Sequence, residues 1–137
     1  DALIREGVAV EAFVSVGEHS GDRHAAETVR ELNRRIPGIR WFGIAGPELQ
    51  KAGIECLVPM GDLNRMGTSE VLGSLPRIHR ILKSVRRECQ ARRPAFMLVV
   101  DSPDFHLRLI RGFRASGVPV FYLAPPKAWA WRGSRAK

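Results

Sequence analysis

The sequence predicts an α/β fold with a doubly wound, mainly parallel sheet. Apolar runs of strand length alternate along the chain with segments whose apolar residues recur at helical spacing, as in successive β-α-β units. One run, FMLVV at residues 96–100, is continuously apolar, as expected for a central parallel strand covered on both faces. With 137 residues, 45% of them hydrophobic, the chain has the length of one domain, and we expect residues 1–137 to form it.

The first strand and the first helix are predicted at the beginning of the chain. Residues 8–16, VAVEAFVSV, are mostly apolar and β-branched, which is typical of a strand. We expect the following helix to be capped by Ser20, to carry Asp22 in its first turn and to stop at Pro37. Its apolar stripe consists of Ala25, Ala26, Val29 and Leu32.

Two more strands are predicted in the next part of the chain. Residues 39–44 form a short apolar run, and residues 54–58 form another that ends at Pro59. A short helix that opens at Pro47 is expected between them. Residues 61–67 are expected to form a loop.

A long helix is predicted before the strand at residues 96–100. Pro76 lies within its apolar pattern, so the helix either begins near this residue or kinks there. After the strand, a helix from about Pro103 is expected to end at Gly117, and residues 118–123 predict a fifth strand. The apolar stripe of the long helix consists of Val71, Leu75, Ile78, Leu82 and Val85.

Asp101 is the first candidate for chemistry because the central strand delivers it to its carboxyl end, where open α/β sheets bind ligands. Ser102 is expected to cap the next helix, with Asp104 in its first turn. Asp101 is interpreted either as a general base or as a carboxylate that only accepts backbone hydrogen bonds. His106 is expected to lie on the surface or in a groove, with pairing to Asp101 as the alternative.

The sequence GEHSGD at residues 17–22 joins the first strand to its helix, where backbone amides attract anions. It lacks the third glycine of a dinucleotide-binding motif and the Lys-Ser/Thr of a P-loop. An ordinary turn is therefore one interpretation. Glu18 and His19 favour a functional one, because bulky ionisable side chains contribute little to a turn.

A net charge of +8 and a pI near 10.7 indicate an anionic partner. The basic helix face within residues 77–93 is either simply solvated or holds phosphates beside the apolar stripe. RNA binding is less favoured, because stacking aromatics do not alternate with these basic residues. Trp129 and Trp131 either wall a cleft or cover the edge of the core.

Cys56 and Cys89 stand alone in different predicted elements, so the sequence indicates neither a zinc site nor a disulfide framework. We expect reduced thiols in a cytosolic protein. No apolar run approaches the length of a membrane span, and no signal-peptide pattern is present. The chain begins without methionine and stops at Lys137 in a basic tail, so both ends are expected to be cut from something longer.

Six segments together resemble the lipid-A-disaccharide synthases, inverting glycosyltransferases built from two Rossmann-like domains. The resemblance implies that this chain is the Rossmann-like N-terminal half of a GT-B type glycosyltransferase. It covers nearly the whole chain, because the segments occur in the family's order. They are SVGEHSGD (15–22), GIAGP (43–47), MGTSEVL (66–72), LPR (75–77), DSPDF (101–105) and WAWR (129–132).

The family transfers 2,3-diacylglucosamine from its UDP derivative to 2,3-diacylglucosamine 1-phosphate (lipid X), giving the β-1,6-linked lipid A disaccharide 1-phosphate and UDP. The resemblance implies this activity for the intact protein, without a metal or other cofactor, at the inner face of the cytoplasmic membrane. The implied partners are both sugar substrates and the anionic membrane surface, with no specific nucleic acid. The C-terminal UDP-sugar-binding domain is expected to be absent from residues 1–137, leaving an acceptor-side half that is inactive alone.

The resemblance also assigns roles to individual residues. Asp101 matches the general base for the acceptor hydroxyl, and Glu18 is the second residue with an implied catalytic role. Met66, Gly67 and Glu70 match a segment beside the acyl chains. The implied substrate-binding residues are Ser20, Gly21, Asp22, Met66, Gly67, Glu70, Trp129 and Arg132.

The chain departs from the family pattern at a few positions. Ser102 replaces a small apolar residue, His106 replaces the more usual Asn, Ala45 replaces a glycine, and the segment before Trp129 is one residue longer. Two alternatives of other classes remain. One is a non-catalytic basic α/β module that binds acyl-sugar phosphates or anionic membrane, and the other, less favoured, is a nucleic-acid-binding domain.

Overall fold

A computed structural model describes residues 10–63, 71–113 and 116–123, with the backbone alone for 71–75. Within these residues, the strands form one parallel sheet in the order β3-β2-β1-β4-β5. The predicted parallel sheet is therefore confirmed, with β1 at its centre. The strands are β1 (Val10–Val16), β2 (Ile39–Ala45), β3 (Glu55–Pro59), β4 (Met97–Val100) and β5 (Val120–Leu123).

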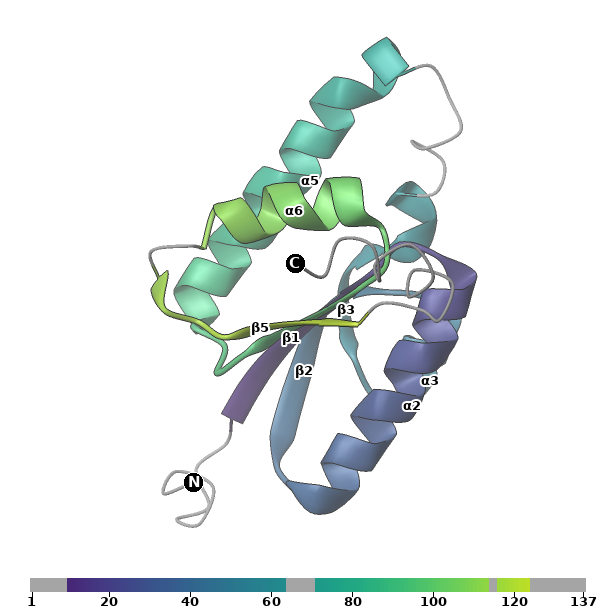
Figure 1. The fold of residues 1–137 in the computed structure, drawn as a ribbon, viewed down its shortest axis with the longest axis vertical. Helices are drawn as coiled ribbons and strands as arrows, with labels where there is room; N and C mark the ends of the chain where they lie inside the picture. The colour runs from purple at the N-terminus through teal and green to yellow at the C-terminus, as the bar shows by residue number, and fades with distance from the viewer. Residues whose placement is uncertain (1–9, 64–70, 114–115, 124–137) are drawn as a thin grey trace, which may run out of the picture.

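Helices cover both faces of the sheet, as the doubly wound prediction requires. Figure 1 shows α2 and α3 on one side of the strands and α5 and α6 on the other. This arrangement explains the continuous apolar sequence of β4, whose side chains are buried on both faces. The helices are α2 (His19–Arg35), α3 (Pro47–Lys51), α5 (Val71–Arg92) and α6 (Pro103–Arg111).

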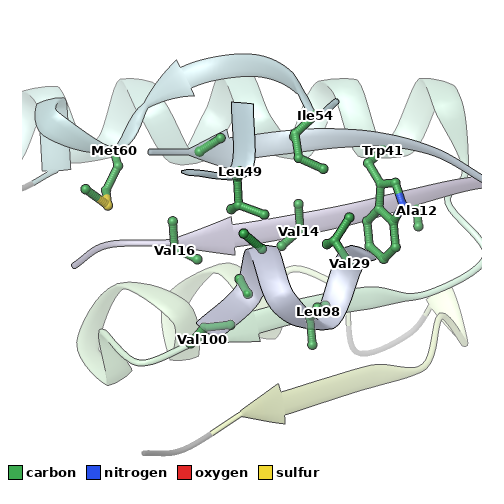
Figure 2. Close-up of a cluster of buried hydrophobic side chains, with 13 residues drawn as sticks. Ala12, Val14, Val16, Val29, Trp41, Leu49, Ile54, Met60, Leu98 and Val100 are labelled. Carbon is green, nitrogen blue, oxygen red and sulfur yellow. The ribbon is translucent and has the colours of Figure 1, made fainter. Parts of the chain in front are cut away.

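Alternate residues of β1 contribute to two separate parts of the core. Val14 and Val16 pack with Val29 of α2 in the cluster that Figure 2 shows. Phe13 points to the opposite face and packs with residues of α5 and α6, among them Leu109. The period of two along the strand thus supplies apolar contacts to both helical layers.

Several predicted boundaries are wrong. The helix α2 begins at His19, so Ser20 lies inside its first turn and does not cap it. Residues 60–63 are helical where a loop was expected. The helix α6 ends at Arg111, with Gly112 as its C-cap residue, rather than at Gly117. The helix α5 does not begin near Pro76, because Pro76 lies inside it.

Arg92, at the end of α5, forms ion pairs with two strands and is therefore not simply solvated. Its guanidinium lies 2.8 Å from a carboxylate oxygen of Glu11 in β1 and 2.8 Å from one of Glu55 in β3. It also stacks over the Phe42 ring, with Cζ 4.2 Å from the ring centroid. Arg92 therefore ties α5 to three strands, and its hydrogen bond and its charge lower the pKa of Glu55 below the ordinary value.

Candidate active site

The strand order places a topological switch point between β1 and β4, because the chain builds the sheet outward from β1 in one direction and then in the other. Val16 pairs with Val100, so the segments that follow these two residues leave the sheet side by side. Crevices at such points are the usual ligand sites of open α/β sheets. The first loop, residues 17–22, and the DSPD segment, residues 101–104, meet there.

Two glycines allow the two loops to approach closely. A Cβ at Gly21 would lie only 2.9 Å from Oδ2 of Asp101. A Cβ at Gly17 would overlap Oγ of Ser102. Gly21 therefore contributes to the site by making room for the Asp101 carboxylate, which is 7% exposed.

The backbone of Asp101 has a left-handed conformation, with φ of 56°, and Ser102 follows with φ of 45°. Such conformations cost about 1–3 kcal/mol each for non-glycine residues and persist where the surroundings impose them. The Asp101 N–H donates to the Leu123 carbonyl at 3.3 Å. The Asp101 carbonyl accepts from Nδ1–H of His106 at 2.6 Å and from the hydroxyl of Tyr122 at 3.1 Å. These three hydrogen bonds hold the strained turn and thereby aim the carboxylate.

Ser102 is the N-cap residue of α6, as predicted, but its side chain makes no capping hydrogen bond. Its left-handed backbone accounts for this, since side-chain capping usually accompanies an extended N-cap backbone. Pro103 and Asp104 occupy the first turn of the helix as expected. Ser102 is therefore the N-cap by position, but its hydroxyl does not cap the helix as expected.

His106 is fully buried, so the expectation of a surface or groove histidine is wrong. Its ring contacts the backbone carbonyl of Asp101, not the carboxylate. Because a carbonyl only accepts, Nδ1 must carry the proton, and Nε2 accepts from the Ser15 hydroxyl at 2.7 Å. Burial lowers the pKa of His106 to about 4, which keeps the ring neutral near pH 7.

The buried ring makes folding stability depend on pH. The pKa falls from 6.5 in the unfolded chain to about 4 in the fold, so the unfolded state binds more protons between these values. The stability is fully present above pH 6.5 and is lost as pH falls toward 4. We expect urea unfolding to report a loss of about 2 kcal/mol between about pH 7 and about pH 4.5 from this residue.

The contribution of His106 is isolated by comparing variants at both pH values. His106→Asn is expected to flatten the pH dependence relative to the unchanged protein. His24→Asn, which replaces an exposed histidine of α2, is expected to leave it unchanged. Equal pH dependence in the unchanged protein and in His106→Asn would contradict the assignment.

Three carboxylates gather near Tyr122 at this edge of the sheet. Burial raises the pKa of Tyr122, and the charges of Asp101, Asp104 and Glu18 raise it further. The Tyr122 hydroxyl consequently stays protonated and remains a donor to the Asp101 carbonyl. The charges of Glu18 and Asp101 thus both act on one phenol, although the two residues come from different loops.

The predicted residues of the first loop have different environments. Glu18 is the exposed N-cap of α2, and Ser20 is exposed in the first turn. Asp22 is 1% exposed, and its carboxylate accepts backbone N–H groups of Gly46, Glu48 and Leu49. The contacts of Asp22 therefore join α2 to α3. Met66, Gly67, Glu70, Trp129 and Arg132 lie outside the described residues.

Neither cysteine is in a disulfide, and burial raises the pKa of the Cys89 thiol to about 12. A thiol with this pKa is a poor nucleophile near neutral pH. Within residues 10–63, 71–113 and 116–123, no three His, Cys, Asp or Glu side chains are grouped as metal ligands. Among the same residues, no helix combines the length and the apolar character needed to cross a membrane.

Solved structures with similar folds are glycosyltransferases. The calicheamicin glycosyltransferase CalG4 aligns with a TM-score of 0.59 and 19% identity, covering 85% of this chain and 30% of CalG4. The glycosyltransferase of kitacinnamycin aligns with a TM-score of 0.56 and 19% identity, covering 92% of this chain and 34% of that protein. The fold is therefore the Rossmann-like domain of GT-B type glycosyltransferases.

Sequence comparison identifies the family. The family model described as lipid-A-disaccharide synthetase matches residues 12–137. The lipid-A-disaccharide synthase of Anaeromyxobacter sp. (strain K) is 48% identical over 91% of this chain, and that of Myxococcus xanthus (strain DK1622) is 44% identical over 91%. The chain belongs to the lipid-A-disaccharide synthetase family. It spans about a third of the length of these relatives, covering 33% of each.

Sequence reasoning missed three features that support the site. Ser15 and Tyr122 were not singled out, and His106 was expected at the surface. Gly17 makes the close contact with the second loop, but a glycine after a strand predicts only a turn. One sequence feature did indicate a buried hydrogen bond here: Ser15 places a polar side chain in an apolar strand, and such a side chain needs a partner.

Proposed function

We propose that this chain is the acceptor-side domain of a lipid-A-disaccharide synthase. In the intact protein, a second domain would hold the UDP-sugar, and residues 1–137 would hold 2,3-diacylglucosamine 1-phosphate. The observation that carries the proposal is Asp101 at the β1/β4 switch point, with its backbone held by hydrogen bonds and its carboxylate against Gly21. Family membership supplies the reaction and its substrates.

In the proposed reaction, Asp101 accepts the proton of the acceptor hydroxyl. The hydroxyl oxygen forms a bond to the anomeric carbon of 2,3-diacylglucosamine as the bond from that carbon to UDP breaks. The configuration inverts, and UDP leaves with the electron pair. Fixing donor and acceptor in line accounts for much of such a rate enhancement, which is why both domains would be required.

Other site residues have supporting roles in the proposal. Glu18, which is exposed and whose charge acts on Tyr122 as that of Asp101 does, would hydrogen-bond a sugar hydroxyl or stabilise charge that develops during transfer. Ser20, also exposed, would bind the acceptor directly, whereas Gly21 and Asp22 would shape the loop that surrounds it. Met66, Gly67 and Glu70 would line the acyl chains, with Trp129 and Arg132 completing the acceptor site.

The proposed location is the inner face of the cytoplasmic membrane, with the protein bound peripherally. The net charge of +8 and the exposed Arg77, Arg80, Lys83 and Arg87 of α5 support attraction to an anionic surface. The lipid character of both substrates supports the same location. No metal or other cofactor is assigned to the reaction.

The experiment that tests this function measures UDP release by the intact protein. UDP-2,3-diacylglucosamine is supplied with and without 2,3-diacylglucosamine 1-phosphate, and the disaccharide is followed by chromatography. We expect acceptor-dependent release of UDP in equal amount to the disaccharide, and none from residues 1–137 alone. Release of UDP without disaccharide, or no release from the intact protein, would contradict the proposal.

A further inference from the structure

A cavity lies away from the candidate active site, between the two helices on one face of the sheet. Figure 1 shows α5 and α6 lying together on this face. The cavity has a volume of about 280 Å³ and lies beside the last turn of α6. Since α6 has nine residues, this end lies roughly 12 Å along the helix from Asp101. Its lining residues are Ile78, His79, Leu82, Arg86, Arg108 and Arg111.

The lining combines cationic side chains with an apolar wall. Three arginines line the cavity, and none of them forms an ion pair within the part of the chain that the structure describes. Some arginines elsewhere do form ion pairs, as Arg34 and Arg35 do with Glu31 and Arg92 does with Glu11. Because like charges repel, three arginines around one cavity favour the binding of an anion there.

Part of this cluster has a structural explanation. Arg108 and Arg111 lie in the last turn of α6, where the helix dipole favours positive charge. Arg86 reaches from α5 and donates to the Arg108 carbonyl at 2.6 Å, which satisfies a free carbonyl at the helix end. Helix capping therefore accounts for one guanidinium nitrogen of Arg86.

Helix capping does not account for Nε of Arg86. This nitrogen is buried and has no hydrogen-bond partner among the residues that the structure describes. Buried donors are nearly always satisfied, and an unsatisfied one beside a cavity indicates a missing acceptor. Gly112 leaves space for this side chain, because a Cβ there would overlap Nε.

We propose that this cavity binds the phosphate group of a lipid. Guanidinium groups bind phosphate oxygens through paired, charge-assisted hydrogen bonds, and Arg86, Arg108 and Arg111 supply donors from two helices. Ile78 and Leu82 supply apolar contacts beside those donors, which suit an amphiphile better than a free anion. The site deepens the peripheral membrane association proposed above, but it does not depend on the transferase activity.

The test compares vesicle binding by variants that carry the same net charge. Co-sedimentation uses phosphatidylcholine vesicles with and without phosphatidylglycerol. Arg108→Gln/Arg111→Gln is expected to weaken binding to the anionic vesicles about 20-fold. The matched control is Arg23→Gln/Arg30→Gln, two exposed arginines of α2 on the other face of the sheet, and we expect at most about a threefold loss. Equal losses in the two pairs would overturn the proposal in favour of general attraction.

Gly112→Ala tests the cavity without changing charge. Gly112 has φ of −69°, so alanine fits the backbone, but the new methyl group must displace Arg86. We expect weaker binding to anionic vesicles with an unchanged far-UV circular dichroism spectrum. Binding equal to that of the unchanged protein would overturn the assignment of Arg86.

A soluble-ligand measurement separates lipid from free phosphate. Calorimetric titration with inorganic phosphate is expected to show no saturable binding. Saturable phosphate binding that Arg108→Gln/Arg111→Gln abolishes, without any vesicle binding, would overturn the lipid assignment. Failure of the transfer assay with intact vesicle binding would contradict the proposed function alone, so the two proposals fail separately.

Discussion

Asp101→Asn is expected to lower the rate of disaccharide formation by the intact protein about 10²–10⁴-fold. The amide is isosteric with the carboxylate but accepts a proton too weakly to serve as a general base. Asparagine tolerates left-handed backbone as well as aspartate does, so the φ of 56° at this position remains accessible. The measurement is the rate at saturating donor and acceptor.

Asp104→Asn is the matched control for that experiment. It makes the same chemical change three residues away, at an exposed position in the first turn of α6. We expect it to retain a transfer rate within about threefold of the unchanged protein, because only a helix-dipole contribution is lost. A rate for Asp101→Asn above about one tenth of the unchanged value would remove the general-base role.

Asp22→Asn is expected to destabilise the fold by about 3 kcal/mol. Both carboxylate oxygens of Asp22 accept backbone N–H groups at the start of α3, at distances of 2.8–3.2 Å. An amide would direct its own N–H donors at these donors and would lose the charge that strengthens the hydrogen bonds. Urea unfolding at neutral pH measures the change.

Glu27→Gln provides the comparison for Asp22, since it removes one exposed carboxylate from the same helix. We expect its stability to stay within about 0.5 kcal/mol of the unchanged protein. If Asp22→Asn also stayed within that range, the join between α2 and α3 would not depend on the carboxylate. A substrate-binding role would then be the better explanation of Asp22.

The position of Asp101 was predictable because local sequence determines it. A continuous apolar run predicts a covered parallel strand, and the residue after such a strand lies at the ligand edge. The close approach of Gly21 to the Asp101 carboxylate could not be predicted, since that contact joins two loops from different units of the fold. Local patterns describe each loop but not their packing.

His106 is a clearer example of a contact that local sequence patterns do not predict. Its partner Ser15 lies 91 positions earlier in the chain, and no periodicity in either segment links the two. Tertiary packing also explains why Ser20 is not the cap of α2. The helix begins at His19, which places Gly21 in the first turn against Asp101. Tertiary contacts therefore overrode local capping preference.

The central position of β1 also has a consequence for biosynthesis. β2 reaches β1 early, because only α2 separates these strands, whereas β4 begins at Met97. Until β4 emerges from the ribosome, one edge of an apolar strand has no neighbour, and such an edge is a template for pairing with another nascent chain. Translation through α5 is therefore the interval in which the unpaired edge of β1 is most open to such pairing.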